Sequence, residues 1–452
     1  MMPPMTPGRL KDLDIDWQAI TDEASDLLRA YIRINTTNPP GGEEAGALFL
    51  REALARDAIA SELHDAGSGR VSISARIPST GPCGEKPLVL LSHIDVVPVE
   101  VEHWDLDPFA GELRDGVIWG RGALDMKGMG IMELMVMALA VRHGLSFDRD
   151  LLFLAVADEE EGGRHGIHFL ADTAPHLLDG SYVFNEGAYG FSEFMGKPAK
   201  LFGFGPSEKS PCWLRLRIQG SPGHASVPHG DNAVARLVRA LARVEERARE
   251  PRMTPPVRAM LELLKRRGFL AEEVDLDDSE TIALFTSADA HLHAVTHDTV
   301  SITGVKAGNK HNVIPVSAEA TLDCRLLPDT DADEFVAHLE ALMDDPGIEI
   351  ERLLAHSSGA SSMDTPAASA VAEAVGSRFG DEAAVMPVLS PGFTDSHAYR
   401  RTGAQAYGFI PALLTREELT TIHGHNERIS QANLGLGIEI LLDVVRRIAE
   451  RH

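Results

Sequence analysis

Cysteine is scarce in this sequence, with three residues among 452. Cys83, Cys212 and Cys324 lie far apart, form no CxxC spacing and cannot all pair with one another. The sequence therefore indicates neither a disulfide framework nor a thiolate zinc site. This cysteine usage favours a reducing compartment, and we expect the protein to be cytoplasmic.

Long hydrophobic runs are also missing. The most apolar stretch, 151–157, has seven residues, and the apolar segment after Ile131 is interrupted by Glu133. A membrane-spanning helix needs about 20 apolar residues, so we expect no transmembrane segment. The residues from Met1 to Lys11 contain no apolar run of the kind that a secretory signal requires, so no export signal is expected.

Positive charge is in deficit, because 42 Lys and Arg stand against 68 Asp and Glu and give a net charge of -26 at pH 7. This excess argues against nucleic acid and anionic membrane surfaces as partners. The hydrophobic and charged fractions, 44% and 24%, are typical of a soluble globular protein. With about 150 residues per domain as a guide, the length predicts two or three domains.

Several common catalytic motifs are absent: GxSxG, GxxxxGK[ST], GxGxxG after a strand, and HExxH. The chain offers instead histidines and carboxylates in five short segments, each at a point where a predicted strand gives way to a loop or helix. These segments are 93–95, 120–125, 159–160, 185–187 and 423–427. Histidine combined with several carboxylates suits zinc or a similar divalent ion.

Helix and strand patterns alternate through the first two hundred residues, which predicts an α/β domain with helices on both faces of a mostly parallel sheet. The expected helices are 22–34, 43–55 and one after Lys127, and the expected strands are 70–77, 88–91 and 151–157. Open α/β sheets bind ligands outside the carboxyl ends of their strands. The acidic segment 158–161 lies directly after such a strand, so we expect the site at that edge.

The pattern changes after Gly203. The expected elements there are strands over 213–218, 299–304 and 318–322 and a helix over 232–244. The sequence thus predicts an α+β layer, 206–324, inserted into a discontinuous α/β domain formed by 1–205 and 325–452. An amphipathic helix over 434–447 closes the chain.

Eight segments occur in an order and at a spacing that resemble one known family. They read LLSHIDVVP, W followed by DPF, GRGALDMKG, AVADEEEGG, FNEG, GSPGHASVPHGDNA, NKHNVIP and IHGHNE. The family is that of the dinuclear zinc hydrolases, which includes aminoacylase, acetylornithine deacetylase, succinyl-diaminopimelate desuccinylase, glutamate carboxypeptidase G and carboxypeptidase S. One such motif alone is weak, but eight in order indicate membership. The resemblance implies a zinc-exopeptidase-like sheet flanked by helices, with an inserted dimerisation (lid) domain.

The resemblance also implies two Zn²⁺ per chain, with Co²⁺ or Mn²⁺ as possible substitutes. The implied ligands are His93 and Glu186 for one ion, Glu160 and His423 for the other, and Asp125 as a bridge between both. His425 is an alternative to His423, but the family spacing, four residues before the Glu of NE, favours His423. Many members carry a second Asp where this chain has Met126, which leaves the surroundings of Asp125 open.

Glu159 is the implied general base. Two metal ions ~3.5 to 4 Å apart can share a water and lower its pKa, and Glu159 would take a proton from this bridging water and return it to the leaving amine. On an extended backbone neighbouring side chains point in opposite directions, so we expect Glu160 to bind metal while Glu159 reaches the water. Asp95, two residues after His93, is expected to hold the imidazole N–H.

Further residues come from the later part of the chain, from His224 onwards. The resemblance implies that His224 of GHAS reaches the partner's active site and stabilises the oxyanion, with an ordinary turn histidine as the alternative. Asn312 and Arg325 would hold the free carboxylate of the substrate, although Arg325 could instead form an ordinary ion pair. Gly392 of SPGFTD would add backbone contacts.

Together these features predict a homodimeric zinc-dependent metallopeptidase or amidohydrolase that cleaves an amide or peptide bond next to a carboxylate-bearing amino acid. Its substrate would be a small acyl-amino acid or a peptide. Acetylornithine-type deacetylation or desuccinylation would use the same residues, because the acyl pocket cannot be read from the sequence. A metal-free binding protein that retains the fold is the alternative from another class, and the complete ligand set argues against it.

Overall fold

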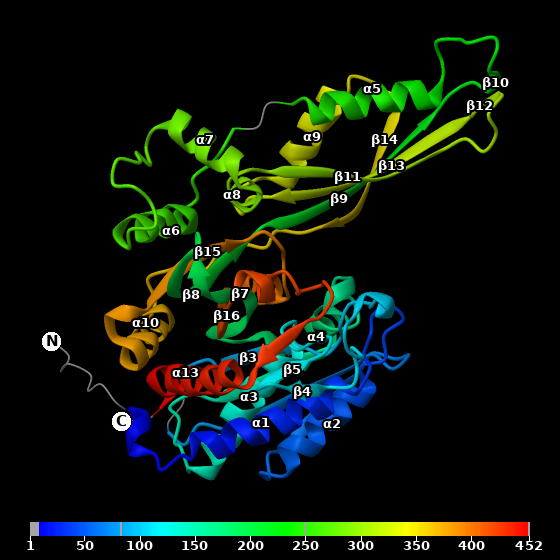
Figure 1. Cartoon of the computed structure of the whole chain (residues 1–452). Helices are drawn as coiled ribbons and strands as arrows, with labels where there is room; N and C mark the ends of the chain where they lie inside the picture. Colours follow the sequence, from blue (N-terminus) through cyan, green and yellow to red (C-terminus); the bar gives the residue numbers. More distant parts are fainter. Residues whose placement is uncertain (1–8, 82–83, 248–249, 451–452) are drawn as a thin grey trace. The chain divides into compact units, whose positions relative to one another are not determined.

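The computed structural model describes residues 9–81, 84–247 and 250–450, so Cys83 and the start of the N-terminal segment lie outside the described residues (Figure 1). The chain forms two compact units. Unit 1 comprises the described residues up to Pro206, then Ser361–Val388 and the residues from Thr394 onwards, and unit 2 comprises Ser207–Ala360 and Leu389–Phe393. Among the described residues, no helix has the length and apolar character needed to cross a membrane.

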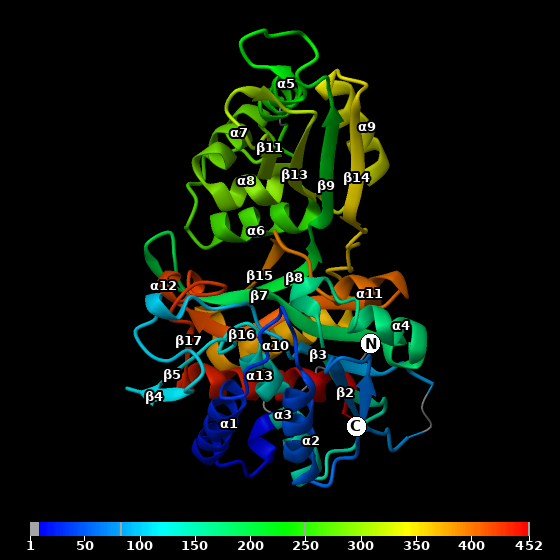
Figure 2. The same ribbon diagram turned by 90° about the vertical axis from the view of Figure 1, so that its right-hand side faces the viewer.

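Unit 1 is built on an eight-stranded sheet in the order β1-β2-β6-β3-β7-β16-β8-β15 (Figure 2). The strands are β1 (Ser61–Asp65), β2 (Val71–Ile77), β3 (Leu88–His93), β6 (Leu151–Val156), β7 (Tyr182–Phe194), β8 (Lys197–Glu208), β15 (Ala384–Ser390) and β16 (Gln405–Leu414). The central strands β6, β3, β7 and β16 are parallel, while β2 and β8 join them antiparallel. The predicted α/β fold with a large, mostly parallel sheet is confirmed.

Helices cover both faces of this sheet because its central strands are apolar on both sides. In β3, Leu88 and Leu90 belong to one core and Val89 and Leu91 to the other. The first core is closed by α1 (Trp17–Ile32), α2 (Glu44–Ala55), α3 (Lys127–Arg142), α10 (Pro366–Phe379) and α13 (Gln431–Ala449), and the second by α4 (Ile167–Thr173) and α11 (Ser396–Arg401). Figure 1 shows α1, α3 and α13 side by side.

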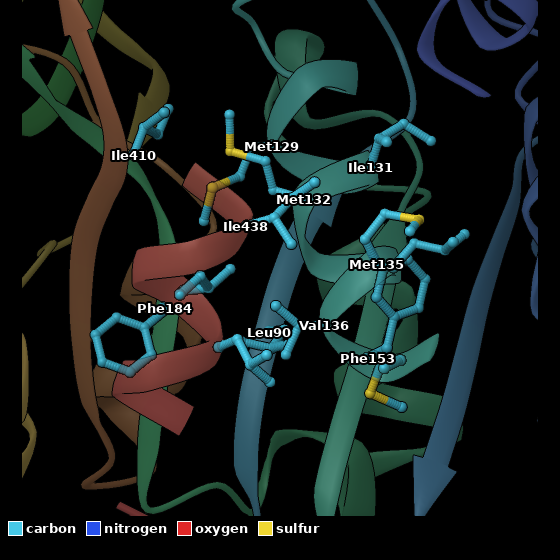
Figure 3. Packing of buried hydrophobic residues seen from close by; sticks show 14 of the residues in the cluster. Leu90, Met129, Ile131, Met132, Met135, Val136, Phe153, Phe184, Ile410 and Ile438 are labelled. Carbon is cyan, nitrogen blue, oxygen red and sulfur yellow. The ribbon is translucent and has the colours of Figure 1, made fainter. Parts of the chain in front are cut away.

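Helix α3 lies in the middle of the first core. Its residues from Lys127 to Ala140 are buried, so the helix is enclosed on all sides rather than half exposed. Figure 3 shows Met129, Met132 and Val136 of this helix near Leu90 of β3 and Ile438 of α13. The packing fixes the start of α3 at Lys127, two residues after Asp125.

A helix cap explains one difference from the sequence prediction. The helix expected over 22–34 begins earlier, at Trp17, because the side chain of Asp16 accepts hydrogen bonds from the backbone amides of Gln18 and Ala19. Such a cap satisfies amides that have no partner within the helix. The other predicted helices and strands of unit 1 lie within a few residues of their expected positions.

Unit 2 contains a four-stranded antiparallel sheet in the order β11-β13-β9-β14. The strands are β9 (Ser210–Gln219), β11 (Thr299–Ala307), β13 (Ser317–Leu326) and β14 (Ile348–Ala355). Helices α5 (Ala233–Glu245) and α9 (Ala332–Met343) share a core with this sheet. Cys212 and Cys324 are buried free thiols at facing positions of β9 and β13.

Unit 2 also holds a short two-stranded sheet and three more helices. The two strands are β10 (Gly223–His224) and β12 (Val313–Ile314), and the helices are α6 (Pro255–Arg266), α7 (Ser279–Ala288) and α8 (Ala290–Thr296). The pairing of β10 with β12 brings together two segments of the chain that carry predicted site residues, His224 in one and Asn312 in the other.

The inserted unit extends beyond the predicted range of 206–324. Residue 324 lies inside β13, and the helix and strand that follow, α9 and β14, belong to unit 2 rather than to the α/β domain. β14 pairs with β9 over Ile348–Ala355, and Ile348 lies in the same core as α5. An alternating pattern predicts a strand but does not say which sheet it joins, so the boundary at 324/325 is replaced by one at Ala360.

Candidate metal centre

The candidate site lies at the carboxyl ends of the parallel strands of unit 1. His93 is the last residue of β3 and pairs with Val156, the last residue of β6. Glu159 and Glu160 follow β6 in the turn η3 (Glu159–Glu161), and Glu186 belongs to the neighbouring strand β7. This is the edge of the sheet at which open α/β folds bind ligands.

Five side chains form two groups of potential metal ligands, and Asp125 belongs to both. The groups are His93, Asp125 and Glu186, and Asp125, Glu160 and His423, with the ligand atoms of each group within 4.8 Å of one another. Oδ1 of Asp125 lies 3.1 Å from Nε2 of His93, and its Oδ2 lies 3.1 Å from Nε2 of His423. Each carboxylate oxygen thus faces one histidine, as a bridging ligand would.

The distances within each group fit a divalent ion. Glu186 Oε1 lies 3.7 Å from His93 Nε2, and Glu160 Oε2 lies 3.3 Å from His423 Nε2. Two ligands that each lie about 2.1 Å from a tetrahedral zinc ion are about 3.4 Å apart. Imidazole nitrogen and carboxylate oxygen are also ligands that zinc accepts, so the residues present fit two such ions.

His425 belongs to neither group. Its Nε2 lies 3.2 Å from Oε2 of Glu100, and its ring lies against that of His103 with the ring centres 5.0 Å apart. Of the two histidines that the sequence left as alternatives, the structure brings only His423 to Asp125.

Burial makes the charges of this site act strongly on one another. Hydrogen bonds to Asp125 and Glu160 raise the pKa of His423 to about 10. Burial alone would lower the pKa of His93, but the surrounding carboxylates outweigh it and hold that pKa well above its ordinary value. Burial would likewise raise the pKa of Asp125, and the two histidines hold it well below its usual range. The site therefore attracts cations, either protons or metal ions.

Asp95 has a different partner from the one expected. Nδ1 of His93 lies 2.9 Å from the backbone carbonyl of Asp95 and 3.6 Å from its carboxylate, so the main chain holds the imidazole N–H. The carboxylate instead accepts hydrogen bonds from the backbone amides of Glu159 and Glu160, at 3.2 and 3.1 Å. Asn38 donates a further bond of 2.8 Å to it. Asp95 thus fixes the turn that carries the two glutamates.

Asp158 gives this turn its shape. Its φ of 67° lies in the left-handed region, which non-glycine residues rarely adopt, and the chain leaves β6 in the turn η3. The expectation of an extended backbone at Glu159 and Glu160 is therefore wrong. The carboxylate of Asp158 accepts a hydrogen bond of 3.0 Å from Asn38, which thus contacts both aspartates that hold the turn.

Glu159 is buried beside the two ligand groups. Burial and the nearby charge of Glu186 raise the pKa of its carboxyl well above the ordinary value. Burial also raises the pKa of Glu160, against the hydrogen bond with His423. A raised pKa makes the carboxylate of Glu159 a stronger base, which favours its role as the general base.

In unit 2, the paired strands β10 and β12 bring His224 and Asn312 together. His224 pairs with Val313, and the backbone amide of Ala225 donates a hydrogen bond of 3.1 Å to the carbonyl of Asn312. Both residues are exposed. The backbone amide and the hydroxyl of Ser226 lie 3.2 and 2.7 Å from Nδ1 of His224.

Arg325 and Gly392 lie elsewhere in unit 2. Arg325 is near the end of β13, eight residues or about 27 Å along the strand from Ser317. Ser317 pairs with Gln219, which lies shortly before β10 in the chain. It forms a bidentate ion pair with Asp323, at 2.7 and 3.1 Å, and its guanidinium lies 5.1 Å from the ring centre of Phe393, the neighbour of Gly392. Within unit 2, therefore, Arg325 and Asn312 are not brought together.

Arg121 and Glu427 lie in the candidate segments 120–125 and 423–427, but the sequence predicted no role for either residue. Both are buried charged residues that lie inside quoted motifs, GRGALDMKG and IHGHNE, and they form an ion pair of 2.6 Å with each other. In the sequence, each is a charged residue in a glycine-rich segment close to an implied metal ligand. An ordinary exposed position explains such a residue poorly, so this pattern could have identified both.

These features define a metal-dependent hydrolase, and comparison with known proteins agrees. The chain belongs to peptidase family M20/M25/M40, whose family model matches residues 89–447. It is similar to aminoacylase-1A of Rattus norvegicus, with 28% identity over 428 residues, 94% of each chain. It is also similar to the N-fatty-acyl-amino acid synthase/hydrolase of Xenopus tropicalis, with 28% identity over 378 residues, 80% of this chain and 72% of that protein.

A solved structure shows the same fold. The M20 family metallo-carboxypeptidase from Sulfolobus solfataricus superimposes with a TM-score of 0.73 at 20% identity and covers 94% of this chain and 99% of its own. The family resemblance inferred from the eight motifs is thereby confirmed.

Proposed function

We propose that this protein is a homodimeric two-zinc hydrolase that cleaves the amide or peptide bond next to a carboxylate-bearing amino acid. The observation that carries the proposal is the pair of ligand groups that share Asp125, with Glu159 buried beside them. The full set of imidazole and carboxylate donors argues against a metal-free binding protein.

Two bound zinc ions would polarise the scissile carbonyl and lower the pKa of an attacking water. Glu159 takes a proton from that water and delivers it to the leaving amine, because a base of this kind serves as acid in the second step. Asp95 holds the backbone of Glu159, so the base stays in place while Glu160, on the same turn, serves as a ligand.

Unit 2 supplies the remaining groups in this proposal. His224 donates a hydrogen bond to the oxyanion, and Asn312, which lies beside it, contacts the substrate. Arg325 and the backbone near Gly392 hold the free carboxylate of the substrate. The guanidinium of Arg325 already binds one carboxylate, that of Asp323, which supports this assignment. In this proposal His224 acts across the dimer, in the active site of the partner subunit, as the family resemblance implies.

The names of the relatives support acyl-amino acids as substrates, since one is an aminoacylase and another a fatty-acyl-amino acid synthase/hydrolase. Carboxypeptidase or dipeptidase activity and acetylornithine-type deacetylation or desuccinylation would use the same centre, and the acyl pocket would decide between them. The small number of cysteines supports a cytoplasmic location.

The test combines metal analysis with a hydrolysis screen. The purified chain is loaded with zinc, freed of excess metal and assayed on N-acetyl, N-succinyl and N-long-chain-acyl amino acids and on dipeptides. Methyl esters of the same acyl-amino acids are the matched controls, because they lack the free carboxylate. We expect about two zinc ions per chain and turnover of one class of free acid but not of its ester. A folded chain that binds no metal would overturn the proposal, and equal turnover of the ester would overturn the role of the carboxylate.

A further inference from the structure

Glu427 is fully buried, and its carboxylate accepts four hydrogen bonds. Its Oε1 accepts from the backbone amides of Leu124 and Asp125, at 2.7 and 2.9 Å. Its Oε2 accepts from the backbone amide of Gly122 at 3.0 Å and from Nη1 of Arg121 at 2.6 Å. One carboxylate thus holds most of the loop that ends in the shared ligand Asp125.

Arg121 connects this loop to a second one. Its Nη2 donates a hydrogen bond of 2.8 Å to the backbone carbonyl of Gly424, the residue after His423. Its guanidinium lies 5.3 Å from the ring centre of Trp104 and is almost fully buried. The ion pair with Glu427 therefore ties the loop of Asp125 to the loop of His423.

The strand pairing explains why these two loops meet. β5 (Val117–Trp119) pairs antiparallel with β17 (Arg428–Ser430), so the residues after Trp119 and those before Arg428 leave the same end of a small sheet. The first loop also fits tightly. Gly122 has a φ of +87°, and a Cβ atom there would lie 2.9 Å from Cγ1 of Val96. A residue with a side chain would be strained at this position, so glycine allows the turn in which the amides of the loop converge on Glu427.

A buried carboxylate is unfavourable unless its charge and hydrogen bonds are satisfied. Glu427 has both: Arg121 balances its charge, and three amides and a guanidinium occupy its oxygens. It belongs to neither group of potential metal ligands among the described residues. Three of its four hydrogen bonds come from the backbone of the loop that carries the ligand Asp125, and the fourth comes from Arg121.

We propose that Glu427 and Arg121 are positioning residues that set the place of Asp125 between the two metal positions and the place of His423 relative to it. The inference rests on the proposed function, because it concerns the two ions which that function requires. Loss of Glu427 would release Asp125 and so weaken both sites. Loss of the contact between Arg121 and Gly424 would weaken chiefly the site of His423.

The first variant is Glu427→Gln. Glutamine has an NH₂ group in place of one carboxylate oxygen, and an amide nitrogen cannot accept a hydrogen bond. The two donors that bind that oxygen in the wild type would therefore face another donor. Glu439→Gln is the matched control, because Glu439 pairs with Arg378 at 3.1 Å on the more exposed side of α13. The two stepwise zinc dissociation constants of the full chain are measured by competition with a chromophoric chelator. Changes outside the ligands typically cost 10- to 100-fold in metal affinity, so we expect both constants to rise by about tenfold or more in Glu427→Gln and neither in the control.

The second variant, Arg121→Lys, keeps the buried charge but lacks the planar fork that reaches both Glu427 and Gly424. We expect it to weaken one of the two zinc sites and to leave the other within about twofold. Spin coupling between two bound Co²⁺ ions provides a reading that a loss of stability alone would not alter. This coupling should be present in the wild type and in Glu439→Gln and reduced in both variants of the pair.

Each outcome has a definite meaning. Unchanged zinc constants and unchanged Co²⁺ coupling in folded Glu427→Gln would overturn the inference. If that variant does not fold, the same result in Arg121→Lys would overturn it. Fewer than two zinc ions on the wild type would instead overturn the proposed function, which keeps the two failures apart.

Discussion

The backbone amide of Ser226 donates a hydrogen bond to Nδ1 of His224, 3.2 Å away. Because an amide N–H can only donate, Nδ1 is the unprotonated nitrogen of the neutral ring. The hydroxyl of Ser226, 2.7 Å from the same nitrogen, can donate as well. The ring proton of His224 therefore lies on Nε2, where it is free to be donated to an oxyanion.

From this tautomer we expect His224→Ala to lower kcat by about 10²- to 10³-fold, the cost of removing one oxyanion donor, and to leave the metal content unchanged. His229→Ala is the matched control, because His229 is an exposed histidine of the same loop. Steady-state kinetics with metal analysis checks the result. An equal loss of activity in both variants would argue that the loop, and not the His224 ring, is responsible.

Mixing two inactive variants tests whether His224 acts across a dimer. When His224→Ala is unfolded and refolded with Glu159→Gln, half of the dimers should be mixed, and each mixed dimer should contain one site with both groups intact. The expected activity is about a quarter of the wild-type value. No recovery of activity would place His224 in the site of its own chain or outside catalysis.

Glu159→Gln should lower kcat by about 10²- to 10⁴-fold, because the base is lost while the ligands remain. The neighbouring Glu161, which is exposed on the same turn, provides the control variant Glu161→Gln. Zinc content and kcat are measured on both. A Glu159→Gln enzyme that keeps near-normal turnover would refute the role of Glu159 as base.

Replacement of Asp95 should give a graded effect. Asn at this position keeps one acceptor for the amides of Glu159 and Glu160, and Ala keeps none, so we expect kcat to fall in the order wild type, Asp95→Asn, Asp95→Ala, by about 10- to 100-fold in total. Asp65→Asn is the control, because the exposed Asp65 also accepts from a backbone amide, that of Gly67, in a distant turn. A loss in Asp95→Asn as large as in Asp95→Ala would contradict the idea that the number of acceptors matters.

The family resemblance implied five metal ligands, and the structure brings these five side chains together in two groups that share Asp125. The resemblance did not predict how the intervening backbone bends. The positive φ of Asp158 turns the chain after β6, and this bend places the amides of Glu159 and Glu160 on Asp95. Such contacts depend on distant segments that only the folded chain brings together.

The boundary of the inserted unit could not be predicted for a similar reason. The alternation of apolar residues in 348–355 indicates a strand, but its partner β9 lies more than a hundred residues earlier. The same holds for Glu427 and Arg121, whose pairing joins segments that are 306 positions apart. Local sequence patterns predict helices and strands. Which distant residues these helices and strands contact depends on long-range pairing, which a local pattern does not contain.

The buried Lys209 of unit 2 predicts a pH dependence of stability. Its Nζ donates to the backbone carbonyl of His297 and to the hydroxyl of Thr299, at 2.8 and 2.9 Å. Burial lowers its pKa from 10.5 to about 7. Between these two values the unfolded chain holds a proton that the folded chain has lost, so the free energy of unfolding should rise with pH, by at most about 1.4 kcal/mol per pH unit. Below about pH 7 Lys209 is protonated in both the folded and the unfolded chain, so it makes no contribution to the pH dependence of the free energy of unfolding there.

We therefore expect Lys209→Met to remove the rise between pH 7 and 10, because the variant has no proton to lose at this position. Lys310→Met, which changes an exposed lysine of the same unit, should leave the rise intact. Denaturant unfolding at a series of pH values measures the effect for all three proteins. Parallel pH curves for the wild type and Lys209→Met would show that Lys209 keeps an ordinary pKa in the folded chain, since only a group that titrates differently in the two states can make stability depend on pH.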